Sequence, residues 1–281
     1  MLSSYSVFLP SYSVGTDCYR EIPYVTRKYG TKAVVIGGKT AMQKAKPELE
    51  TAIRGSKVEI VDYIWYGGDS NYENIEKLKA NETVQNADML FGVGGGRACD
   101  TVKTLADMLD KPFFTFPTLA CTAITVIYNA DGSFKEYYYM HGPAYHTFVN
   151  TKIIADSPEK LLWAGIGDAL SKECEVLFAS RDKFIYHTPL MGQCVAKVCT
   201  ALEACRKNEA DFALEQVALD IIMSTGIVSN FATHENQPDP KDNYYYNSSL
   251  AHCVYYGAST LPQCERHLHG EIVSFGVLCL L

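Results

Sequence analysis

The chain lacks the long apolar runs that mark membrane proteins. No apolar stretch of its 281 residues approaches the length of about 20 residues that a membrane-spanning helix needs. The first residues, Met-Leu-Ser-Ser-Tyr-Ser, also lack the basic and apolar regions of a secretory signal. We therefore expect a cytoplasmic protein that has no membrane partner.

Runs of lysine and arginine are absent as well. The 25 basic residues are outnumbered by 32 acidic ones, which gives a net charge of −7. A nucleic-acid-binding protein usually carries a basic patch or stripe. The sequence therefore predicts that nucleic acid is not a partner.

The ten cysteines are scattered and contain no Cys-x-x-Cys pair. A structural zinc site made of thiolates is thus disfavoured. In a chain without a secretory signal, such cysteines are typical of small buried hydrophobic residues that stay reduced. Internal repeats and low-complexity tracts are also absent.

What the sequence does contain is a first half in which apolar strands alternate with helices. Such alternation predicts right-handed crossovers and a parallel sheet. We assign residues 1–156 to this α/β domain. Its expected strands are residues 32–38, 58–66, 89–94 and 111–117, and its expected helices are residues 40–54, 72–85 and 97–107.

The second half, residues 157–281, reads as an all-α domain. A hairpin at residues 124–140, turning at Asp131-Gly132, precedes it. A helix is expected to begin at Ser157-Pro158-Glu159, where proline suits the first helical position. Further helices are expected near residues 186–206, 211–232, 244–257 and 267–281, with a loop at 233–243. Because the last residues are strongly apolar and carry no C-cap, we expect that a C-terminal portion is missing.

Three consecutive glycines, Gly94–Gly96, stand where a strand gives way to a helix. Glycine lets a ligand approach the backbone closely, and the start of a helix favours an anion such as a pyrophosphate. Gly37 and Gly38 end another strand at the same edge of the predicted sheet, where ligands of parallel sheets bind. The run departs from the usual dinucleotide fingerprint, and glycines also serve tight turns that hold no ligand. Both interpretations stay open from the residues alone.

Three residues of the helical half form a second candidate site. Asp168 follows Gly-Ile-Gly, His252 lies in Ser-Leu-Ala-His-Cys, and His269 lies in His-Leu-His-Gly-Glu. If they converge, two imidazoles and a carboxylate leave an open position on a zinc ion, which is the arrangement of catalytic zinc sites. Taken singly, Asp168 also suits a helix cap and His252 a hydrogen-bonded core histidine.

Five ordered motifs make the chain resemble glycerol dehydrogenases of the group III, iron-containing alcohol dehydrogenase superfamily. They are Gly-Gly-Gly-x-x-x-Asp after a strand, Pro-Thr, Gly-Ile-Gly-Asp-Ala-Leu, Leu-Ala-His and His-Gly-Glu-x-x-x-Phe-Gly. The resemblance covers essentially the whole chain. It implies a dehydroquinate synthase-like architecture, with a nucleotide-binding α/β domain, a helical domain, and a cleft between them for NAD(P) and a divalent metal.

The resemblance also implies roles for individual residues. It makes Asp168, His252 and His269 the metal ligands and the catalytic residues that act through the metal. It makes Gly94, Gly95 and Gly96 the pyrophosphate cradle. It selects His269 over His267, because residues two positions apart on a helix point in different directions. The remaining residues implied to lie along or near the cofactor are Gly37, Gly38, Lys39, Asp100, Lys103, Thr115 and Thr118.

The chain departs from the family pattern at three places. Iron-type members resemble Asp-x-x-x-His, but the fourth position after Asp168 is Lys172, which favours zinc over iron. Lys39 stands where the family has an acidic residue for the adenosine ribose, so NADP is open beside NAD, as is a merely solvated lysine. The segment after Pro117-Thr118 is shorter than in the family, through either a trimmed loop or residues missing from the sequence.

We therefore predict an NAD(P)- and metal-dependent oxidoreductase that interconverts a polyol or small alcohol and its ketone or aldehyde. We also expect a homo-oligomer. Two alternatives stay open. One is an NAD- and metal-dependent lyase of the dehydroquinate synthase type, and the other is a non-catalytic nucleotide-binding relative.

Overall fold

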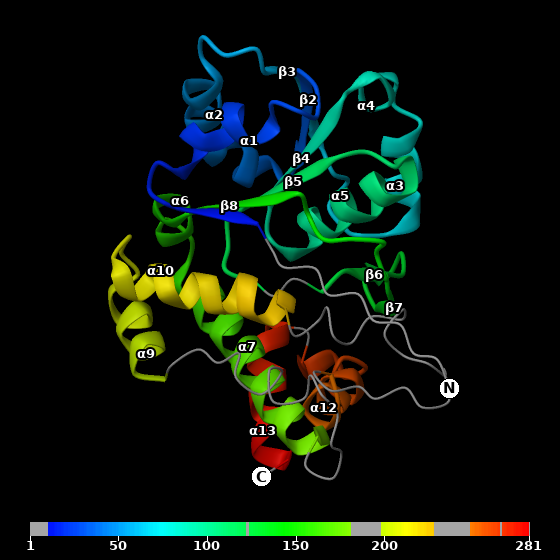
Figure 1. The fold of residues 1–281 in the computed structure, drawn as a ribbon. Coiled ribbons are helices and arrows are strands. Elements are labelled where there is room, and N and C mark those ends of the chain that lie inside the picture. Colours follow the sequence, from blue (N-terminus) through cyan, green and yellow to red (C-terminus); the bar gives the residue numbers. More distant parts are fainter. Residues whose placement is uncertain (1–10, 122–123, 181–197, 228–247, 265, 281) are drawn as a thin grey trace, which may run out of the picture. The chain divides into compact units, whose positions relative to one another are not determined.

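The computed structural model describes residues 11–121, 124–180, 198–227, 248–264 and 266–280 (Figure 1). These residues separate into two compact units. An α/β unit contains residues 11–119 and 124–157, and a helical unit contains residues 120–121 and those described from 158 onward. The predicted loop at 233–243 and most of the helix predicted near 186–206 lie outside the described residues.

A six-stranded parallel sheet forms the centre of the α/β unit, as predicted. Its strand order is β1-β8-β5-β4-β2-β3. Four of these strands are the predicted ones, whereas β1 and β8, which pair with each other at one edge, were not predicted. The strands are β1 (Tyr12–Gly15), β2 (Lys32–Gly37), β3 (Glu59–Trp65), β4 (Met89–Gly94), β5 (Phe113–Pro117) and β8 (His146–Asn150).

Helices cover both faces of the sheet, because alternate residues of its inner strands are apolar on both sides. Ala33 and Val35 of β2 join a core with α1 and α2, while Val34 and Ile36 join a core with α3, α4 and α5 (Figure 1). Both-sided burial is why these strands read as continuous apolar runs. The helices of the unit are η1 (Cys18–Glu21), α1 (Ile22–Thr26), α2 (Lys39–Ile53), α3 (Tyr72–Lys79), α4 (Glu82–Asn86), α5 (Gly96–Leu109) and α6 (Thr151–Ala155).

The single helix predicted at residues 72–85 is wrong, because two short helices, α3 and α4, occupy this segment. Asn81 separates them, and its side chain accepts hydrogen bonds from the backbone N–H groups of Thr83 and Val84. Asparagine is a strong N-cap residue. Asn81 therefore starts a second helix at a point where the apolar periodicity alone predicts that the first helix continues.

The predicted hairpin is confirmed as a two-stranded antiparallel sheet of β6 (Val126–Tyr128) and β7 (Phe134–Tyr137). Gly132, at φ +80°, supplies the left-handed conformation that the turn requires. The N–H of Asn129 donates to the carbonyl oxygen of Ser133 and closes the turn.

The helical unit is built around α7 (Glu159–Ser180), which packs against α13 (His269–Leu280). Glycines let the two helices approach closely. A Cβ on Gly270 would lie 1.8 Å from the carbonyl oxygen of Ala164, and one on Gly167 would lie 2.8 Å from that of Gly270. The other described elements are α9 (Val198–Lys207), α10 (Phe212–Leu219), a π-helical turn (Asp220–Ser224), α12 (Leu250–Ala258) and a 3₁₀ turn, η5 (Pro262–Cys264).

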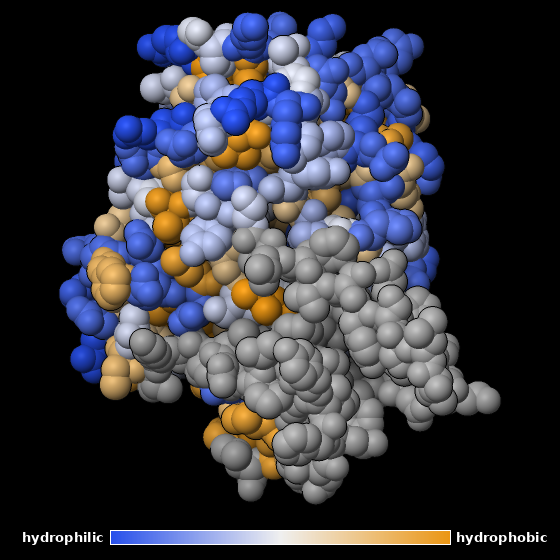
Figure 2. Space-filling view, viewed as in Figure 1, coloured by the Kyte–Doolittle hydropathy of each residue, from blue (hydrophilic) through white to orange (hydrophobic). Residues whose placement is uncertain are grey.

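The visible surface of the α/β unit is mostly hydrophilic, and its hydrophobic residues form small separate patches (Figure 2). None of the helices in the described part of the chain is both long and apolar enough to cross a membrane.

Candidate metal centre and nucleotide cradle

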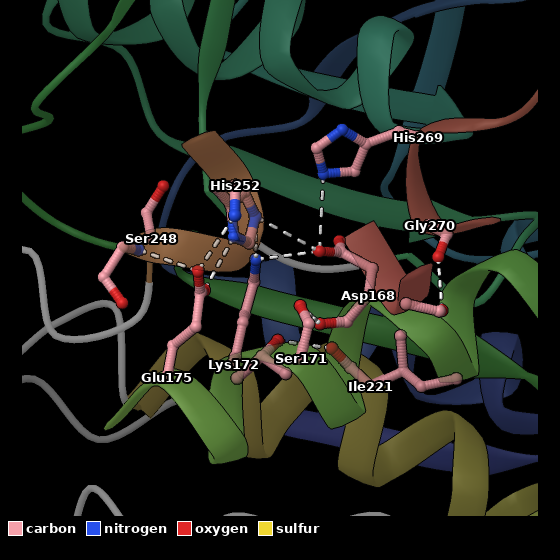
Figure 3. A network of polar contacts seen from close by, with 12 residues as sticks. Asp168, Ser171, Lys172, Glu175, Ile221, Ser248, His252, His269 and Gly270 are labelled. Atoms are coloured by element: carbon pink, nitrogen blue, oxygen red, sulfur yellow. Dashed lines mark hydrogen bonds and ion pairs between the residues drawn. The ribbon is translucent and has the colours of Figure 1, made fainter. Parts of the chain in front are cut away.

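The structure brings together the three residues of the predicted metal site. Asp168 comes from the middle of α7, His252 from α12 and His269 from the first position of α13. One possible ligand atom of each residue lies within 4.8 Å of those of the other two (Figure 3). The alternative that Asp168 caps a helix is wrong, since nine residues of α7 precede it and its side chain is buried.

The distances within this group are short. Oδ1 of Asp168 lies 3.6 Å from Nε2 of His252 and 3.4 Å from Nε2 of His269. His267 was expected to lie on the same helix as His269 and to point in a different direction. This expectation is wrong, because His267 precedes α13. Its Nδ1 lies 3.5 Å from Oε2 of Glu271, which gives it a different partner.

Asp168 is held in its ionised form. Burial opposes its charge, but charged and hydrogen-bonding neighbours, the Lys172 ammonium foremost, more than offset this and hold the pKa of Asp168 well below its ordinary value. Nζ of Lys172 lies 3.0 Å from Oδ1 of Asp168 and 3.4 Å from Nε2 of His252. The lysine predicted to exclude a fourth imidazole therefore contacts two of the three candidate ligands.

Glu175 orients His252, and it was not predicted from the sequence. Its Oε2 lies 2.7 Å from Nδ1 of His252, and its Oε1 accepts from the backbone N–H groups of His252 and Ser249, each at 2.9 Å. A buried carboxylate with these neighbours favours the tautomer in which Nδ1 carries the proton. Nε2, which faces Asp168, is then left with its lone pair. Glu175 follows Asp168 by seven positions, which is two helical turns, so a search of the same helix face could have found it.

His269 is the accessible member of the group, with a side chain that is 41% exposed. Loss of solvation, helped by His252 and Lys172 and opposed by Asp168, lowers the pKa of His269 below its ordinary value of 6.5. A lowered pKa favours the neutral imidazole, which carries the lone pair that a metal ligand needs.

These donors fit a divalent transition metal. One carboxylate and two imidazole nitrogens form the three-ligand set of catalytic zinc sites. A second carboxylate that accepts the other N–H of a ligand histidine is the usual outer partner of such a site. We therefore treat Asp168, His252 and His269 as a candidate metal centre.

The glycines of the predicted cradle meet at the switch point of the sheet, because β2 lies between β3 and β4. The N–H of Gly38 donates to the carbonyl oxygen of Val93 at 3.2 Å, and a Cβ on Gly37 would lie 2.1 Å from that oxygen. Gly94, at φ +155°, turns the chain into α5, and a Cβ there would lie 2.7 Å from that of Ala98. Parallel sheets bind nucleotides at such a point.

Gly95 is the N-cap of α5 and makes no side-chain hydrogen bond, and Gly96 is its first residue. A Cβ on Gly95 would lie 2.8 Å from Cδ1 of Leu119, so a side chain at this position would displace that leucine. The backbone N–H groups at a helix N-terminus favour an anion such as a pyrophosphate.

The other predicted cofactor residues lie at the same edge of the sheet or on α5. Asp100 is buried on α5, beside the Lys103 ammonium at 3.3 Å, and burial raises its pKa to about 6. Thr115 of β5 shares a hydrogen bond with Thr147 of β8, at 2.8 Å between the two hydroxyls. The N–H of Thr118 donates to the carbonyl oxygen of Gly94. The first residue of α2 is Lys39.

Comparison with known proteins identifies relatives along most of the chain. The family model described as iron-containing alcohol dehydrogenase matches residues 10–147. A glycerol dehydrogenase from Escherichia coli O6:H1 is 26% identical over 96% of this chain and 74% of its own length. A glycerol dehydrogenase from Thermotoga maritima is 27% identical over 77% of this chain and 60% of its own length. Hydroxycarboxylate dehydrogenase A from Escherichia coli K12 is 29% identical over 91% of this chain and 71% of its own length.

Solved structures of such proteins share the fold. A probable glycerol dehydrogenase from Sinorhizobium meliloti matches with a TM-score of 0.79 at 23% identity, over 99% of this chain and 78% of that one. Glycerol dehydrogenase from Schizosaccharomyces pombe matches with a TM-score of 0.78 at 22% identity, over 99% of this chain and 72% of that one. The predicted fold class is confirmed.

The relatives are named as dehydrogenases, which supports an alcohol or polyol oxidoreductase. They do not favour the lyase or the non-catalytic protein that the sequence left open. The family model over residues 10–147, the sequence relatives and the fold agree with the ordered motifs, and together they support a glycerol dehydrogenase-like protein related to the iron-containing alcohol dehydrogenases.

Proposed function

We propose that this oxidoreductase uses NAD(P) and a divalent metal to interconvert a polyol or small alcohol and its ketone or aldehyde. In this proposal the domain of residues 1–156 binds the dinucleotide, and the domain of residues 157–281 binds the metal. The observation that carries it is the convergence of Asp168, His252 and His269 around one point, with Glu175 behind His252.

Each residue of the centre has a task that follows from its contacts. Asp168, His252 and His269 would hold the ion, Lys172 keeps Asp168 ionised, and Glu175 keeps the Nε2 lone pair of His252 turned inward. A metal held there would supply Lewis-acid activation of the substrate oxygen, while the nicotinamide would supply the hydride acceptor or donor. The exposed edge of His269 leaves one side of the centre accessible.

We propose zinc as the metal, although the matching family is named for iron. The support is the donor set. Three protein ligands with an open position suit catalytic zinc, and Lys172 stands where a fourth imidazole would be needed. That the chain forms a homo-oligomer and that it is cytoplasmic stay predictions of the sequence.

Metal content and turnover of two histidine variants test the proposal. His269→Ala removes a candidate ligand that is partly exposed, so the fold should survive, while His267→Ala removes a neighbour outside the centre. We expect His269→Ala to lose the bound metal, measured by elemental analysis, together with alcohol oxidation, and His267→Ala to keep both. Full turnover by a metal-free His269→Ala protein would refute the assignment.

A further inference from the structure

We propose that Tyr255 is a positioning residue of the candidate metal centre, because its ring packs against the imidazole of His269 and fixes the direction of the metal-binding nitrogen, Nε2. The role presupposes a divalent metal held by Asp168, His252 and His269, so the inference rests on the proposed function. Tyr255 itself belongs to none of the ordered motifs and is not one of the three candidate ligands.

The two candidate ligand histidines are held in different ways. Nδ1 of His252 lies 2.7 Å from Oε2 of Glu175, so a hydrogen bond fixes the ring. Within the described residues, Nδ1 of His269 has no such partner, and its side chain is partly exposed. The torsion that turns an imidazole ring is soft, and the lone pair of Nε2 lies in the plane of the ring. Without another restraint, the lone pair of His269 would therefore swing away from the metal.

The ring of Tyr255 provides that restraint. Its centroid lies 4.3 Å from that of the His269 imidazole, with 81° between the two planes. This is the edge-to-face arrangement that aromatic pairs prefer. At so short a separation, the imidazole plane cannot turn unless the tyrosine ring moves too. The contact therefore keeps Nε2 of His269 directed toward Oδ1 of Asp168, 3.4 Å away (Figure 3).

The backbone of His269 is already fixed on both sides. The N–H of Leu268 donates to Oε2 of Glu271 at 2.8 Å and holds the start of α13. A Cβ on Gly270 would lie 1.8 Å from the carbonyl oxygen of Ala164, so α13 rests directly on α7. These contacts place the Cα atom of His269, and the direction of its ring is left to side-chain packing.

Tyr255 is itself anchored between two helices. It lies on α12, about one turn after His252, so a single helix supplies one candidate ligand and the ring that orients the other. Tyr255 also packs against the small core of Ala251, Val273 and Val277. The two valines belong to α13, the helix that begins at His269. The ring that restrains His269 is therefore tied to the helix that carries His269.

Zinc affinity and the absorption of the cobalt(II)-loaded protein test this role without turnover. Tyr255→Phe keeps the ring, whereas Tyr255→Leu removes it and retains an apolar side chain for the core. In competition with a chromogenic chelator, we expect Tyr255→Leu to bind zinc about 10- to 100-fold more weakly, which is the range for loss of an outer partner of a metal ligand. Tyr255→Phe should keep the wild-type affinity. Tyr255→Met, a second ring-free variant with a flexible side chain, should behave like Tyr255→Leu.

The cobalt spectrum separates positioning from packing. The visible bands of cobalt(II) depend on the number and geometry of its ligands. We expect Tyr255→Phe to reproduce the wild-type spectrum, and the ring-free variants to change its intensity and band positions. A tyrosine that only fills space would lower the unfolding temperature of the metal-free protein and leave the spectrum unchanged.

Tyr256→Leu is the matched control. Tyr256 is the next residue of α12 and is also half-buried, but the candidate ligand near its ring is His252, at 6.5 Å between centroids, which Glu175 already holds. The Tyr256 ring also lies 5.7 Å from that of Tyr255, so the control measures what the loss of a neighbouring aromatic ring does by itself. We expect Tyr256→Leu to keep the wild-type zinc affinity and cobalt spectrum.

Wild-type affinity and spectrum in both ring-free variants would overturn the inference. So would an equal loss in Tyr256→Leu, which would trace the effect to the packing of α12, or an equal loss in Tyr255→Phe, which would trace it to the hydroxyl. Each of these results leaves the metal centre itself intact. If the wild-type protein binds neither zinc nor cobalt, the proposed metal centre is wrong, and the positioning role falls with it.

Discussion

Replacing Glu175 by glutamine isolates the contribution of a side chain that touches only one of the candidate ligands. The carboxylate accepts three hydrogen bonds, from two backbone N–H groups and from Nδ1 of His252. In the Glu175→Gln variant the amide oxygen can keep the two backbone bonds, which turns the NH₂ group toward Nδ1. The imidazole must then accept at Nδ1 and carry its proton on Nε2.

The size of the expected effect follows from the change of tautomer of His252, whose ring proton lies on Nε2 in the variant and not on Nδ1. A protonated Nε2 has no lone pair for a metal, and loss of such an outer partner typically costs about 10- to 100-fold in metal affinity. This range corresponds to about 1.4–2.7 kcal/mol. Because the change in volume is small and the backbone bonds persist, the thermal unfolding temperature of the metal-free protein should fall only slightly.

Competition with a chromogenic zinc chelator measures the affinity. Glu173→Gln, two positions away on α7, is the control, since Glu173 is only partly buried and is not among the residues within ligand distance of one another. We expect a weaker affinity in Glu175→Gln and an unchanged one in Glu173→Gln. Wild-type zinc affinity in Glu175→Gln would refute the role assigned to this carboxylate.

Two further predictions concern packing and pH. Gly270→Ala places a Cβ against the backbone of Ala164 and must push α13 away from α7, so we expect a lower unfolding temperature and weaker zinc binding. Gly257→Ala, with open space around the added Cβ, should keep the wild-type unfolding temperature and zinc affinity. Wild-type zinc affinity in Gly270→Ala would contradict this prediction. Asp100 has a folded-state pKa of about 6 against an ordinary value of 3.8, so the folded protein keeps a proton that the unfolded chain releases. Stability should therefore fall as the pH rises from about 4 to 6, by about 3 kcal/mol in total. Asp100→Asn should lack this part of the pH dependence in denaturant titrations, and parallel pH profiles of the two proteins would contradict it.

The sheet was predictable where its strands are buried on both faces. β2, β4 and β5 read as apolar runs because helices cover both sides of them. β8 was missed because it mixes His146, Thr147 and Asn150 with two apolar residues. β1 was missed because it is a four-residue edge strand that is mostly half-exposed. Short strands of this kind form through tertiary pairing, which local sequence does not encode.

The candidate metal ligands could be predicted from the sequence, but the residue that orients one of them could not. The motifs named Asp168, His252 and His269, and these residues meet in space. The contact between Glu175 and His252 joins positions 77 residues apart and exists only because α7 packs beside α12. Helical spacing relates only residues a few positions apart, so it could not predict this contact. The position of Lys172, by contrast, follows from the sequence, since residues four apart on a helix share a face.

The division of the chain into two units has a consequence for how its two sites can be studied. Every side chain of the candidate metal centre belongs to the helical unit, and every residue of the glycine cradle belongs to the α/β unit. Among the described residues, neither set includes a side chain of the other unit. A substitution in one site should therefore weaken binding at that site alone. The binding isotherm of the other site, measured on the same sample, then serves as the internal control.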